Sequence, residues 1–319
     1  MAYTAIRATC ALTMQYIGRF APSPTGPLHF GSLIAAVASY CDAKSHFDNG
    51  RPGTWLVRME DLDKPREMAG AADDILRTLE AFGFEWDDAV IFQSQRAEFY
   101  QQALQNLDNL NLIYACTCSR KEIADSSILM GIEGAIYPKT CFLNRNKHSS
   151  IHAAYRAVVS DKNISFTDVI QGDITQNLAH DIGDFIIKRS DGLFAYQLAV
   201  VVDDAAQNIS HIVRGADLLN STARQVYLQQ LLGFSKPNYA HTPVAVNAQG
   251  EKLSKQTLAQ PISISSAAQQ LLHALRFLGQ NPPPQLQNVS LNEMWRWAIA
   301  NWQLDNVPKT HTLRQPVLV

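Results

Sequence analysis

The 319-residue sequence lacks long hydrophobic segments, a recognisable secretory signal and a disulfide-type cysteine pattern. Its longest apolar runs, such as residues 198–202, are far too short to cross a bilayer. Residues 1–15 have no clear cationic start, long apolar region or cleavage site, so we interpret them as a disordered extension or as an overcalled start upstream of Met14. Five cysteines, an odd number without a signal, favour a reducing compartment. We therefore expect a cytoplasmic protein.

The sequence also lacks a strong excess of charge of either sign. Its net charge is −2, so a nucleic-acid partner would need a local basic surface instead of a basic protein as a whole. Hydrophobic residues make up 46% and charged residues 18% of the chain, which is ordinary for a folded protein. The length allows two or three structural units with a substantial core.

Short apolar runs and helical spacing alternate along the first third of the chain. Residues 16–20 and 55–59 have the pattern of short buried strands. Residues 31–47, 71–82 and 98–112 have apolar positions at helical spacing. Strands that alternate with helices in this way predict a parallel α/β sheet.

The character of the chain changes from residue 114, where cysteines appear and periodicity fades until about residue 150. Strands are expected at 164–170 and 185–188, and the alternating pattern then resumes. The segments that carry it are 195–202, 209–213 and 216–232. Near the end, two amphipathic helices are separated by three prolines at 282–284; they are expected at 264–278 and 291–302.

The most specific signal is the segment 19–32, Arg-Phe-Ala-Pro-Ser-Pro-Thr-Gly-Pro-Leu-His-Phe-Gly-Ser. A strand leads into a Pro/Gly turn and the turn into a helix, which directs backbone N–H groups and a partial positive charge at a ligand above the helix N-terminus. Gly31 lets a ligand approach the backbone closely, and His29 can donate to phosphate oxygens. Taken alone, His29 is explained at least as well as a structural histidine of a turn, with its hydrogen bonds made within the protein, as by phosphate binding.

A second polar loop, Glu-Lys-Leu-Ser-Lys-Gln at 251–256, follows the apolar run 243–246. Lys252 and Lys255 lie three residues apart with a small hydroxyl residue between them, which suits a mobile loop that closes over a polyphosphate. By itself such a loop is more often a solvated basic turn. Its occurrence together with segment 19–32, at opposite ends of an α/β unit, favours nucleotide binding.

These two segments carry a family resemblance. Residues 29–32 resemble the HIGH motif of class I aminoacyl-tRNA synthetases, and residues 252–256 resemble their KMSKS loop. The context from Arg19 onward is similar to the glutamyl branch of that class. Ser32 and Gln256 depart from the last positions of the two motifs.

The resemblance extends from residue 18 to about 256 and implies a Rossmann-like, parallel-sheet catalytic domain of the α/β class that uses ATP with Mg²⁺. It implies that ATP is bound by His29, Gly31, Ser32 and Lys255. It assigns catalytic roles to His29, Lys252 and Lys255, of which Lys255 would stabilise the transition-state phosphate.

A glutamate substrate carries two carboxylates and one ammonium, so its pocket needs arginines and one acid. Arg19 lies at the end of the first predicted strand and Glu60 at the end of the second, and ligands of parallel sheets gather beyond the carboxyl ends of the strands. The resemblance adds a tyrosine and a further arginine, which can hold a carboxylate with two parallel bonds. The predicted glutamate-binding residues are Arg19, Phe20, Ala21, Pro22, Ser23, Glu60, Tyr196 and Arg214. Without the resemblance, the charged ones fit surface ion pairs equally well.

The pair Asp203 and Asp204 also matches the family pattern, although a helix-capping or structural role explains it as well.

Three cysteines form another constellation, since Cys116, Cys118 and Cys141 lie within about 25 residues in a region with little core of its own. Three thiolates at this spacing fit one structural Zn²⁺ per chain, which would cross-link and stabilise the segment. Tyr137 matches a Tyr-x-x-x-Cys pattern of the resembling family and is favoured as the fourth ligand, with His148 as the ordinary chemical alternative. Incidental free cysteines are the other interpretation.

Only 63 residues follow Gln256, too few for the anticodon-binding domain of a full glutamyl-tRNA synthetase. With the cysteine segment and Arg-Gly-Ala-Asp-Leu-Leu-x-Ser-Thr at 214–222, this resembles the glutamyl-Q tRNA(Asp) synthetase family. The resemblance implies activation of L-glutamate without tRNA, then its transfer to queuosine at the wobble position of tRNA(Asp). The partners would be L-glutamate, ATP and the tRNA(Asp) anticodon loop, and the protein a monomer. The alternatives are a minimal synthetase charging a tRNA 3′ end and a non-catalytic tRNA-binding paralogue.

The sequence pattern and the resemblance together predict five parts of the chain. They are the extension 1–15, the first half of the catalytic domain 16–113, an insertion with the zinc and a tRNA-acceptor-like subdomain 114–182, the second half with the KMSKS-like loop 183–260, and a C-terminal helical part 261–319.

Overall fold

Parallel strands form the centre of the computed structural model, which describes residues 15–48, 50–144, 152–253 and 260–315. One sheet has the order β1-β4-β5, and a second has the order β11-β10-β14-β13. Their strands are β1 (Ile17–Phe20), β4 (Thr54–Met59), β5 (Ile91–Phe92), β10 (Asn163–Asp168), β11 (Gly172–Asn177), β13 (His211–Gly215) and β14 (Asn238–Thr242). Only β11 runs antiparallel to its neighbour.

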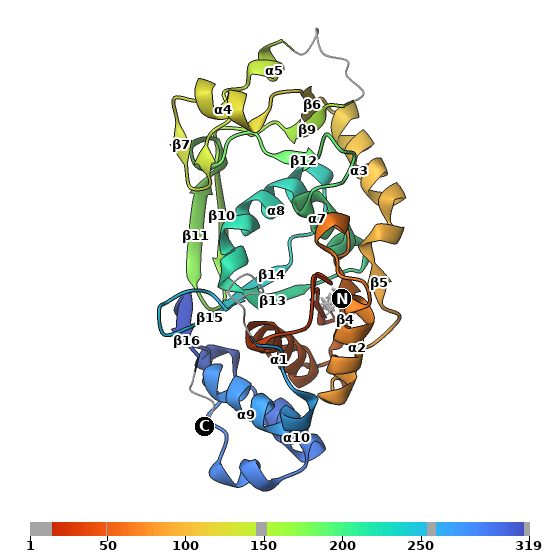
Figure 1. The fold of residues 1–319 in the computed structure, drawn as a ribbon, viewed down its shortest axis with the longest axis vertical. Coiled ribbons are helices and arrows are strands. Elements are labelled where there is room, and N and C mark those ends of the chain that lie inside the picture. Colours follow the sequence, from red (N-terminus) through yellow and green to blue (C-terminus); the bar gives the residue numbers. More distant parts are fainter. Residues whose placement is uncertain (1–14, 49, 145–151, 254–259, 316–319) are drawn as a thin grey trace, which may run out of the picture.

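The two sheets meet where β1 starts beside β13. The backbone N–H of Ser210 donates to the carbonyl of Ile17 at 2.9 Å, and the N–H of Ile17 donates to the Ser210 hydroxyl at 2.8 Å. The strands of the two halves of the chain therefore line up side by side, with helices on both faces (Figure 1). The parallel α/β fold expected from the sequence is confirmed.

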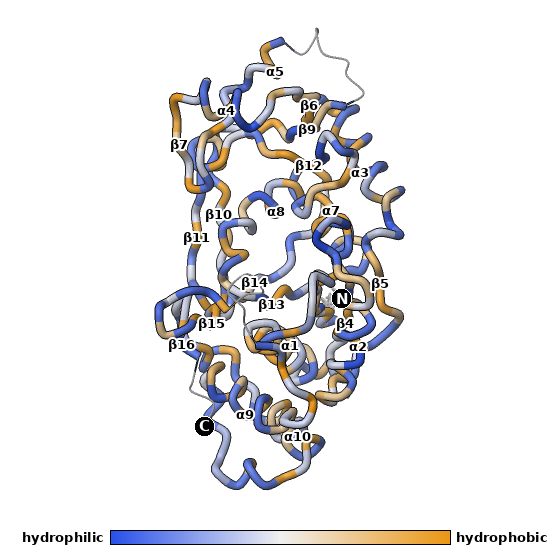
Figure 2. Tube along the Cα trace, viewed as in Figure 1, coloured by the Kyte–Doolittle hydropathy of each residue, from blue (hydrophilic) through white to orange (hydrophobic). Residues whose placement is uncertain are grey.

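Each face of the sheet packs against its own group of helices. The first group is α1 (Phe30–Ser45), α2 (Ala71–Ala81), α9 (Ala267–Phe277) and α10 (Leu291–Asn301). The second group is α3 (Ala97–Asn109), α7 (Tyr196–Ala206) and α8 (Leu219–Leu232). Along α3, hydrophobic and hydrophilic residues alternate as expected for a helix with one solvated face (Figure 2).

Strand β4 shows how side chains are distributed between the two faces. Successive side chains of a strand point to opposite faces. Trp55 and Val57 accordingly join the core on the α1 side, and Leu56 joins the core on the α7 and α8 side. Arg58, two residues after Leu56, shares the second face and is completely buried. This alternation decides which face receives each charged residue near the strand ends.

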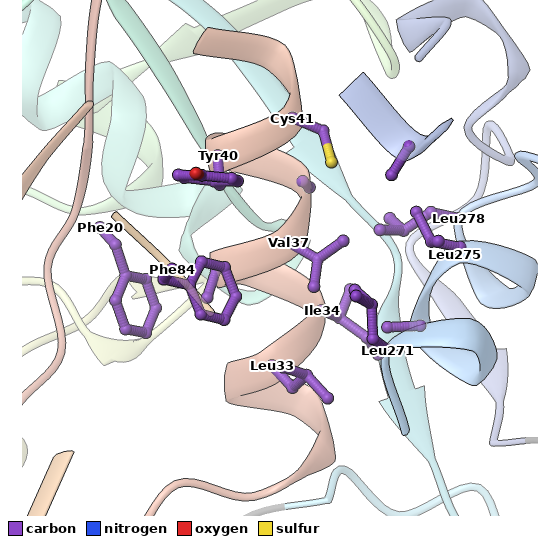
Figure 3. Packing of buried hydrophobic residues seen from close by; sticks show 14 of the residues in the cluster. Phe20, Leu33, Ile34, Val37, Tyr40, Cys41, Phe84, Leu271, Leu275 and Leu278 are labelled. Carbon is purple, nitrogen blue, oxygen red and sulfur yellow. The ribbon is translucent and has the colours of Figure 1, made fainter. Parts of the chain in front are cut away.

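Helix α1 occupies the middle of the first core. Figure 3 shows Tyr40 and Phe84 on one side of it, and Leu271, Leu275 and Leu278 of the α9 region on the other. The helix expected at 31–47 begins at Phe30 and ends at Ser45 because His29 caps its start and Phe47 enters a short strand, β2 (Phe47–Asp48).

The C-terminal helices are fixed to the sheet domain by two tryptophans. Trp295 of α10 donates its indole N–H to the carbonyl of Phe82 at 2.8 Å, and Trp302 donates to the Asp42 carboxylate at 2.9 Å. Beyond them, β16 (Thr312–Arg314) pairs in parallel with β15 (Val244–Val246). The helices expected at 264–278 and 291–302 are confirmed with ends shifted by up to three residues.

A small antiparallel sheet lies at the opposite end of the molecule (Figure 1). It consists of β6 (Ile113–Cys116), β9 (Ala154–Ala157) and β12 (Ile186–Lys188). Only the third was expected, since β6 and β9 are four residues long and show no alternation of buried and exposed positions. The remaining elements here are α4 (Arg120–Ser126), α5 (Thr140–Leu143), α6 (Leu178–Asp181) and the hairpin β7 (Met130–Gly131) and β8 (Gly134–Ala135).

Among the described residues, no helix combines the length and apolar character needed to cross a bilayer. The extension expected at 1–15 lies outside the described residues except for Gln15, whose amide donates to Thr54 at 3.2 Å.

Replacing Trp295 with alanine should lower the free energy of unfolding by about 3–5 kcal/mol, because a large buried ring and its hydrogen bond are both lost. Urea denaturation would measure this loss. The matched control is Arg296→Ala, one residue along the same helix and exposed, which should change stability by no more than about 0.5 kcal/mol. Equal effects of the two substitutions would contradict the anchoring role of Trp295.

Candidate functional site

A pocket of about 770 Å³ opens at the carboxyl ends of β1 and β13, between the start of α1 and the loop after β15. All of the predicted site residues for glutamate and nucleotide that the structure describes line it. They are Arg19, Phe20, Ala21, Pro22, Ser23, His29, Gly31, Ser32, Glu60, Tyr196, Arg214 and Lys252. Lys255 and Gln256 lie outside the described residues. The structure thus brings two segments more than 200 residues apart to one cavity; the roles of these residues stay predictions.

The start of α1 is shaped by His29, which occupies the N-cap position. Its Nδ1 accepts the backbone N–H of Ser32 at 3.3 Å. An accepting Nδ1 places the hydrogen of the neutral ring on Nε2, so this second nitrogen is the donor. A Cβ on Gly31 would lie 3.1 Å from the His29 ring, and therefore glycine keeps the capping histidine in place.

Three charged groups form a buried network beneath the pocket. The Asp204 carboxylate of α7 accepts from Arg19 Nε at 3.1 Å and from Arg58 Nη2 at 2.8 Å. Burial by itself would raise the pKa of Asp204, but the two guanidinium groups outweigh it and hold this pKa below its usual value. Asp204 therefore has a structural role, and it fixes the orientation of Arg19 at the pocket floor.

Glu60 lies next to this network without a short ion pair. Its Oε1 lies 3.5 Å from Arg58 Nη2. Burial raises the pKa of Glu60 above 4.5, and the attraction of Arg58 and Arg19 only partly offsets it. A buried carboxylate in this situation gains most from a cation that enters the pocket.

Arg214, at the end of β13, donates hydrogen bonds to four neutral groups. Its Nε donates to His241 at 3.0 Å, and its Nη2 donates to Thr222 at 2.9 Å and to Gln225 at 2.7 Å. Its Nη1 donates to the hydroxyl of Tyr196 at 3.4 Å, a side chain whose pKa is raised by burial. Among the described residues, no carboxylate pairs with Arg214, although it is 5% exposed.

Asp203 has a different function from its neighbour. Its carboxylate accepts from Arg96 at 2.6 Å, Tyr100 at 2.7 Å and Gln93 at 2.8 Å. It fastens α3 and the turn before it to α7. Both aspartates are therefore structural, one of the two interpretations that the sequence left open.

On the rim of the pocket, Lys252 forms an ion pair with Asp217 at 2.5 Å. Asp217 follows β13 in the one-turn helix Ala216–Leu218. Its side chain is 33% exposed, and that of Lys252 is 49% exposed. The pair joins the start of the KMSKS-like loop to the strand that carries Arg214.

Sequence reasoning missed Arg58, Asp168, Asp217 and His241. Arg58 could have been found, because it precedes Glu60 by two residues and so lies on the same face of β4. Asp217 lies within the segment 214–222 that carries the family resemblance, but no role was assigned to it there. Asp168 and His241 come from separate strands, and no local pattern signals their contact with the pocket residues.

The cysteine cluster lies far from this pocket, in the antiparallel end of the molecule. Cys116 ends β6, Cys118 precedes α4 and Cys141 lies in α5; their sulfur atoms are all within 4.8 Å of one another. Cys118 Sγ is 3.5 Å from Cys141 Sγ and 3.6 Å from the hydroxyl of Tyr137. His148, the alternative to Tyr137 as fourth ligand, lies outside the described residues.

This arrangement fits a tetrahedral Zn²⁺ ion, in which sulfurs bonded at about 2.3 Å lie about 3.8 Å apart. Burial by itself would raise the pKa of Cys141, but hydrogen bonds from Tyr137, the Thr117 backbone and the other two cysteines lower it from 9.0 to about 7. The hydroxyl of Tyr137 also accepts the backbone N–H of Cys141 at 2.8 Å. The donor set is therefore one that a soft divalent metal prefers.

Comparison with known proteins identifies a family and solved structures with a similar fold. Residues 16–301 match the family described as tRNA synthetases class I (E and Q), catalytic domain. The crystal structure of glutamate-tRNA synthetase from Elizabethkingia anophelis is similar in fold, with a TM-score of 0.75 at 23% identity, and covers 95% of this chain and 68% of that one. A glutamate tRNA ligase from Elizabethkingia meningosepticum, in complex with its amino acid, gives 0.73 at 24% identity, over 95% and 67%.

Curated relatives match more closely in sequence. The glutamyl-Q tRNA(Asp) synthetase of Dechloromonas aromatica is 54% identical over 96% of this chain and 100% of its own length. The protein of the same name from Chromobacterium violaceum is 55% identical over 92% and 95%. That of Pseudomonas aeruginosa PAO1 is 50% identical over 95% and 98%. The chain therefore belongs to the class I (E and Q) tRNA synthetase family and, within it, to the glutamyl-Q tRNA(Asp) synthetases.

Proposed function

We propose that this chain activates L-glutamate with ATP, without needing tRNA, and then transfers the glutamyl group to the queuosine base at the wobble position of tRNA(Asp). The observation that carries the first half is a pair of oppositely charged groups in the pocket. Arg214 pairs with no carboxylate among the described residues, and the Glu60 carboxylate lies 3.5 Å from the guanidinium of Arg58. A ligand that carries both a carboxylate and an ammonium group, such as glutamate, complements these two groups.

The two unmatched groups suggest how glutamate is oriented. Arg214 has no carboxylate partner among the described residues and can bind one carboxylate of the ligand. Glu60 is buried with a raised pKa and can bind the ammonium group. Arg19, fixed by Asp204, lies on the pocket floor with the turn Phe20–Ser23 beside it.

ATP is proposed to bind where α1 starts. The first-turn residues Gly31 and Ser32 line the pocket, and His29 presents a donor at Nε2. Lys252 also lines the pocket, in the loop whose Leu253 carbonyl approaches Gly31, and Lys255 follows it in the sequence. An oxygen of the glutamate α-carboxylate then attacks the α-phosphorus, the bond to pyrophosphate breaks, and these positive groups stabilise the charge on the leaving pyrophosphate.

In the second step a hydroxyl of the tRNA attacks the carbonyl of the mixed anhydride, and AMP leaves. We assign no general base to this step and attribute it to proximity and orientation. The choice of the anticodon loop of tRNA(Asp) as acceptor is supported by the name that the curated relatives share. We further propose that the protein acts as a monomer in the cytoplasm, where its tRNA substrate is found.

We also propose one structural Zn²⁺ per chain, held by Cys116, Cys118, Cys141 and Tyr137. The metal would cross-link three short elements whose own core is limited to a few side chains.

The acceptor is tested by incubating the protein with ATP, radiolabelled glutamate and tRNA(Asp) that contains or lacks queuosine. We expect label only on the queuosine-containing tRNA, and expect it to survive removal of the 3′ adenosine. Label on both tRNAs that is lost with the 3′ end would instead identify a minimal glutamyl-tRNA synthetase. No label on either tRNA, together with absent glutamate-dependent pyrophosphate exchange, would refute the enzymatic assignment.

A second prediction concerns pH. Because the pKa of Glu60 is raised above 4.5, its carboxylate becomes protonated as the pH falls through that raised value, and the ammonium of glutamate loses its partner. The kcat/KM for glutamate in ATP–pyrophosphate exchange should therefore decline with falling pH, with an inflection above 4.5.

Glu60→Gln should remove this inflection and reduce kcat/KM about 10–100-fold, the value of one charge-assisted hydrogen bond. Glu80→Gln, on the exposed side of α2, is the matched control and should keep the wild-type profile. An unchanged inflection in Glu60→Gln would assign it to another group.

The zinc site is tested by Cys118→Ser, which should reduce the bound zinc below one per chain and lower the melting temperature, while surviving enzyme keeps most of its pyrophosphate-exchange activity. Atomic absorption would measure the metal. Cys41→Ala, a buried cysteine of α1 outside the cluster, should retain full zinc. Stoichiometric zinc in Cys118→Ser would refute the site, and full zinc in Tyr137→Phe would leave Tyr137 only its hydrogen bond to Cys141.

A further inference from the structure

Behind Arg214 lies a second buried pair that the proposed chemistry does not use. His241 of β14 is the register partner of Arg214 on β13. Its Nε2 lies 3.0 Å from Arg214 Nε, and its Nδ1 lies 2.6 Å from Asp168 Oδ2. The side chains of His241 and Asp168 are fully buried. The three residues therefore form a continuous row from the pocket into the protein interior.

The direction of every hydrogen bond in this row is fixed. The Nε of an arginine only donates, so Nε2 of His241 must accept. The neutral ring then carries its hydrogen on Nδ1 and donates it to Asp168. Burial lowers the pKa of His241 from 6.5 to about 4, with the hydrogen bond to Asp168 only partly opposing it, so the ring is neutral near pH 7.

Asp168 is itself rigidly held at the end of β10. Its Oδ1 accepts three backbone N–H groups, those of Ile170 at 3.1 Å, Gln171 at 2.9 Å and His241 at 3.1 Å. This leaves Oδ2 directed at the imidazole. Asp168 thereby determines which nitrogen of His241 carries the hydrogen, since a carboxylate can only accept.

The imidazole also separates two opposite charges. Thr222 and Gln225 bind Arg214 through neutral oxygens, and His241 binds it through a neutral nitrogen. A direct ion pair between Asp168 and Arg214 would neutralise the guanidinium and compete with a ligand carboxylate. With the ring between them, Arg214 is held firmly and keeps its charge available to the pocket.

We propose that His241 and Asp168 are positioning residues that orient the guanidinium of Arg214 and preserve its charge for the carboxylate of the substrate. This inference rests on the proposed function, since it takes the ligand of Arg214 to be glutamate. It predicts a selective effect on glutamate binding, because neither residue lines the part of the pocket assigned to ATP.

The sharpest test is Asp168→Asn, which keeps the size of the side chain. If the amide oxygen keeps the three backbone bonds, the amide NH₂ faces Nδ1 of His241. The ring must then carry its hydrogen on Nε2, against the N–H of Arg214, as in the wrong-tautomer effect known for an Asp–His pair. We expect the KM for glutamate in pyrophosphate exchange to rise about 10–100-fold, equivalent to one lost hydrogen bond to a charged group.

The KM for ATP should stay within about twofold of wild type, and nitrogen-15 NMR of the imidazole should report the change of tautomer. The matched control is Asp161→Asn, an exposed aspartate two residues before the same strand, which should change neither constant. In an Arg214→Gln background, Asp168→Asn should add less than about twofold, since coupled residues are not additive. An equal rise of both KM values, or a full additional loss in that background, would overturn the proposal.

A second pair of variants covers the case in which Asp168→Asn does not fold. His241→Gln keeps an oxygen that can accept from Arg214, whereas His241→Leu removes the acceptor. We expect the KM for glutamate to be at least about tenfold higher in His241→Leu than in His241→Gln; equal values would overturn the positioning role. Wild-type protein without glutamate-dependent exchange would instead refute the proposed function, so the two failures are distinguishable.

Discussion

The Asp204 carboxylate, placed between the guanidinium groups of Arg19 and Arg58, is the interaction on which the site depends. All three groups are at most 5% exposed, and a buried charge is tolerated only when it is paired and hydrogen-bonded. These two ion pairs join β1 and β4 of the first half of the chain to α7 of the second. The same contact that satisfies the buried charges therefore holds the two halves of the catalytic domain in register around the pocket.

Against this neutralised network, Arg214 differs in the chemistry of its partners. It is as deeply buried as Arg19, yet it is surrounded by an imidazole, a hydroxyl, an amide and a phenol. Such partners fix the geometry of a guanidinium without cancelling its charge, which is what electrostatic preorganisation for an anionic ligand requires. The site thus contains two arginines whose charge is neutralised by Asp204 and one, Arg214, whose charge is not neutralised by the side chains that bind it.

The two ends of the molecule are stabilised by different means. At the α9 and α10 end, Trp295 and Trp302 pack on α1 and add hydrogen bonds to the sheet domain, so hydrophobic burial suffices. At the other end, the core around the cysteines consists of four buried side chains with a few partly buried neighbours. In a segment with so little apolar burial a cross-link would contribute more to stability, and the three converging thiols could hold a metal ion that supplies one.

Periodicity and the strand–turn–helix motif are local properties of the chain, so the parallel α/β class, the main helices and the segment 19–32 could be predicted from the sequence. Tyr196 and Arg214 were predicted only through the family resemblance. The sequence did not reveal the strands β6 and β9, which are too short to alternate. It also did not reveal the roles of Asp168 and His241, since His241 is 27 residues from Arg214 and 73 residues from Asp168 in the sequence, and only the pairing of their strands brings the three together. It also left Asp203 and Asp204 ambiguous. Only the tertiary structure decided which arginines are neutralised and which one is not, since burial and ion pairing depend on contacts between distant elements.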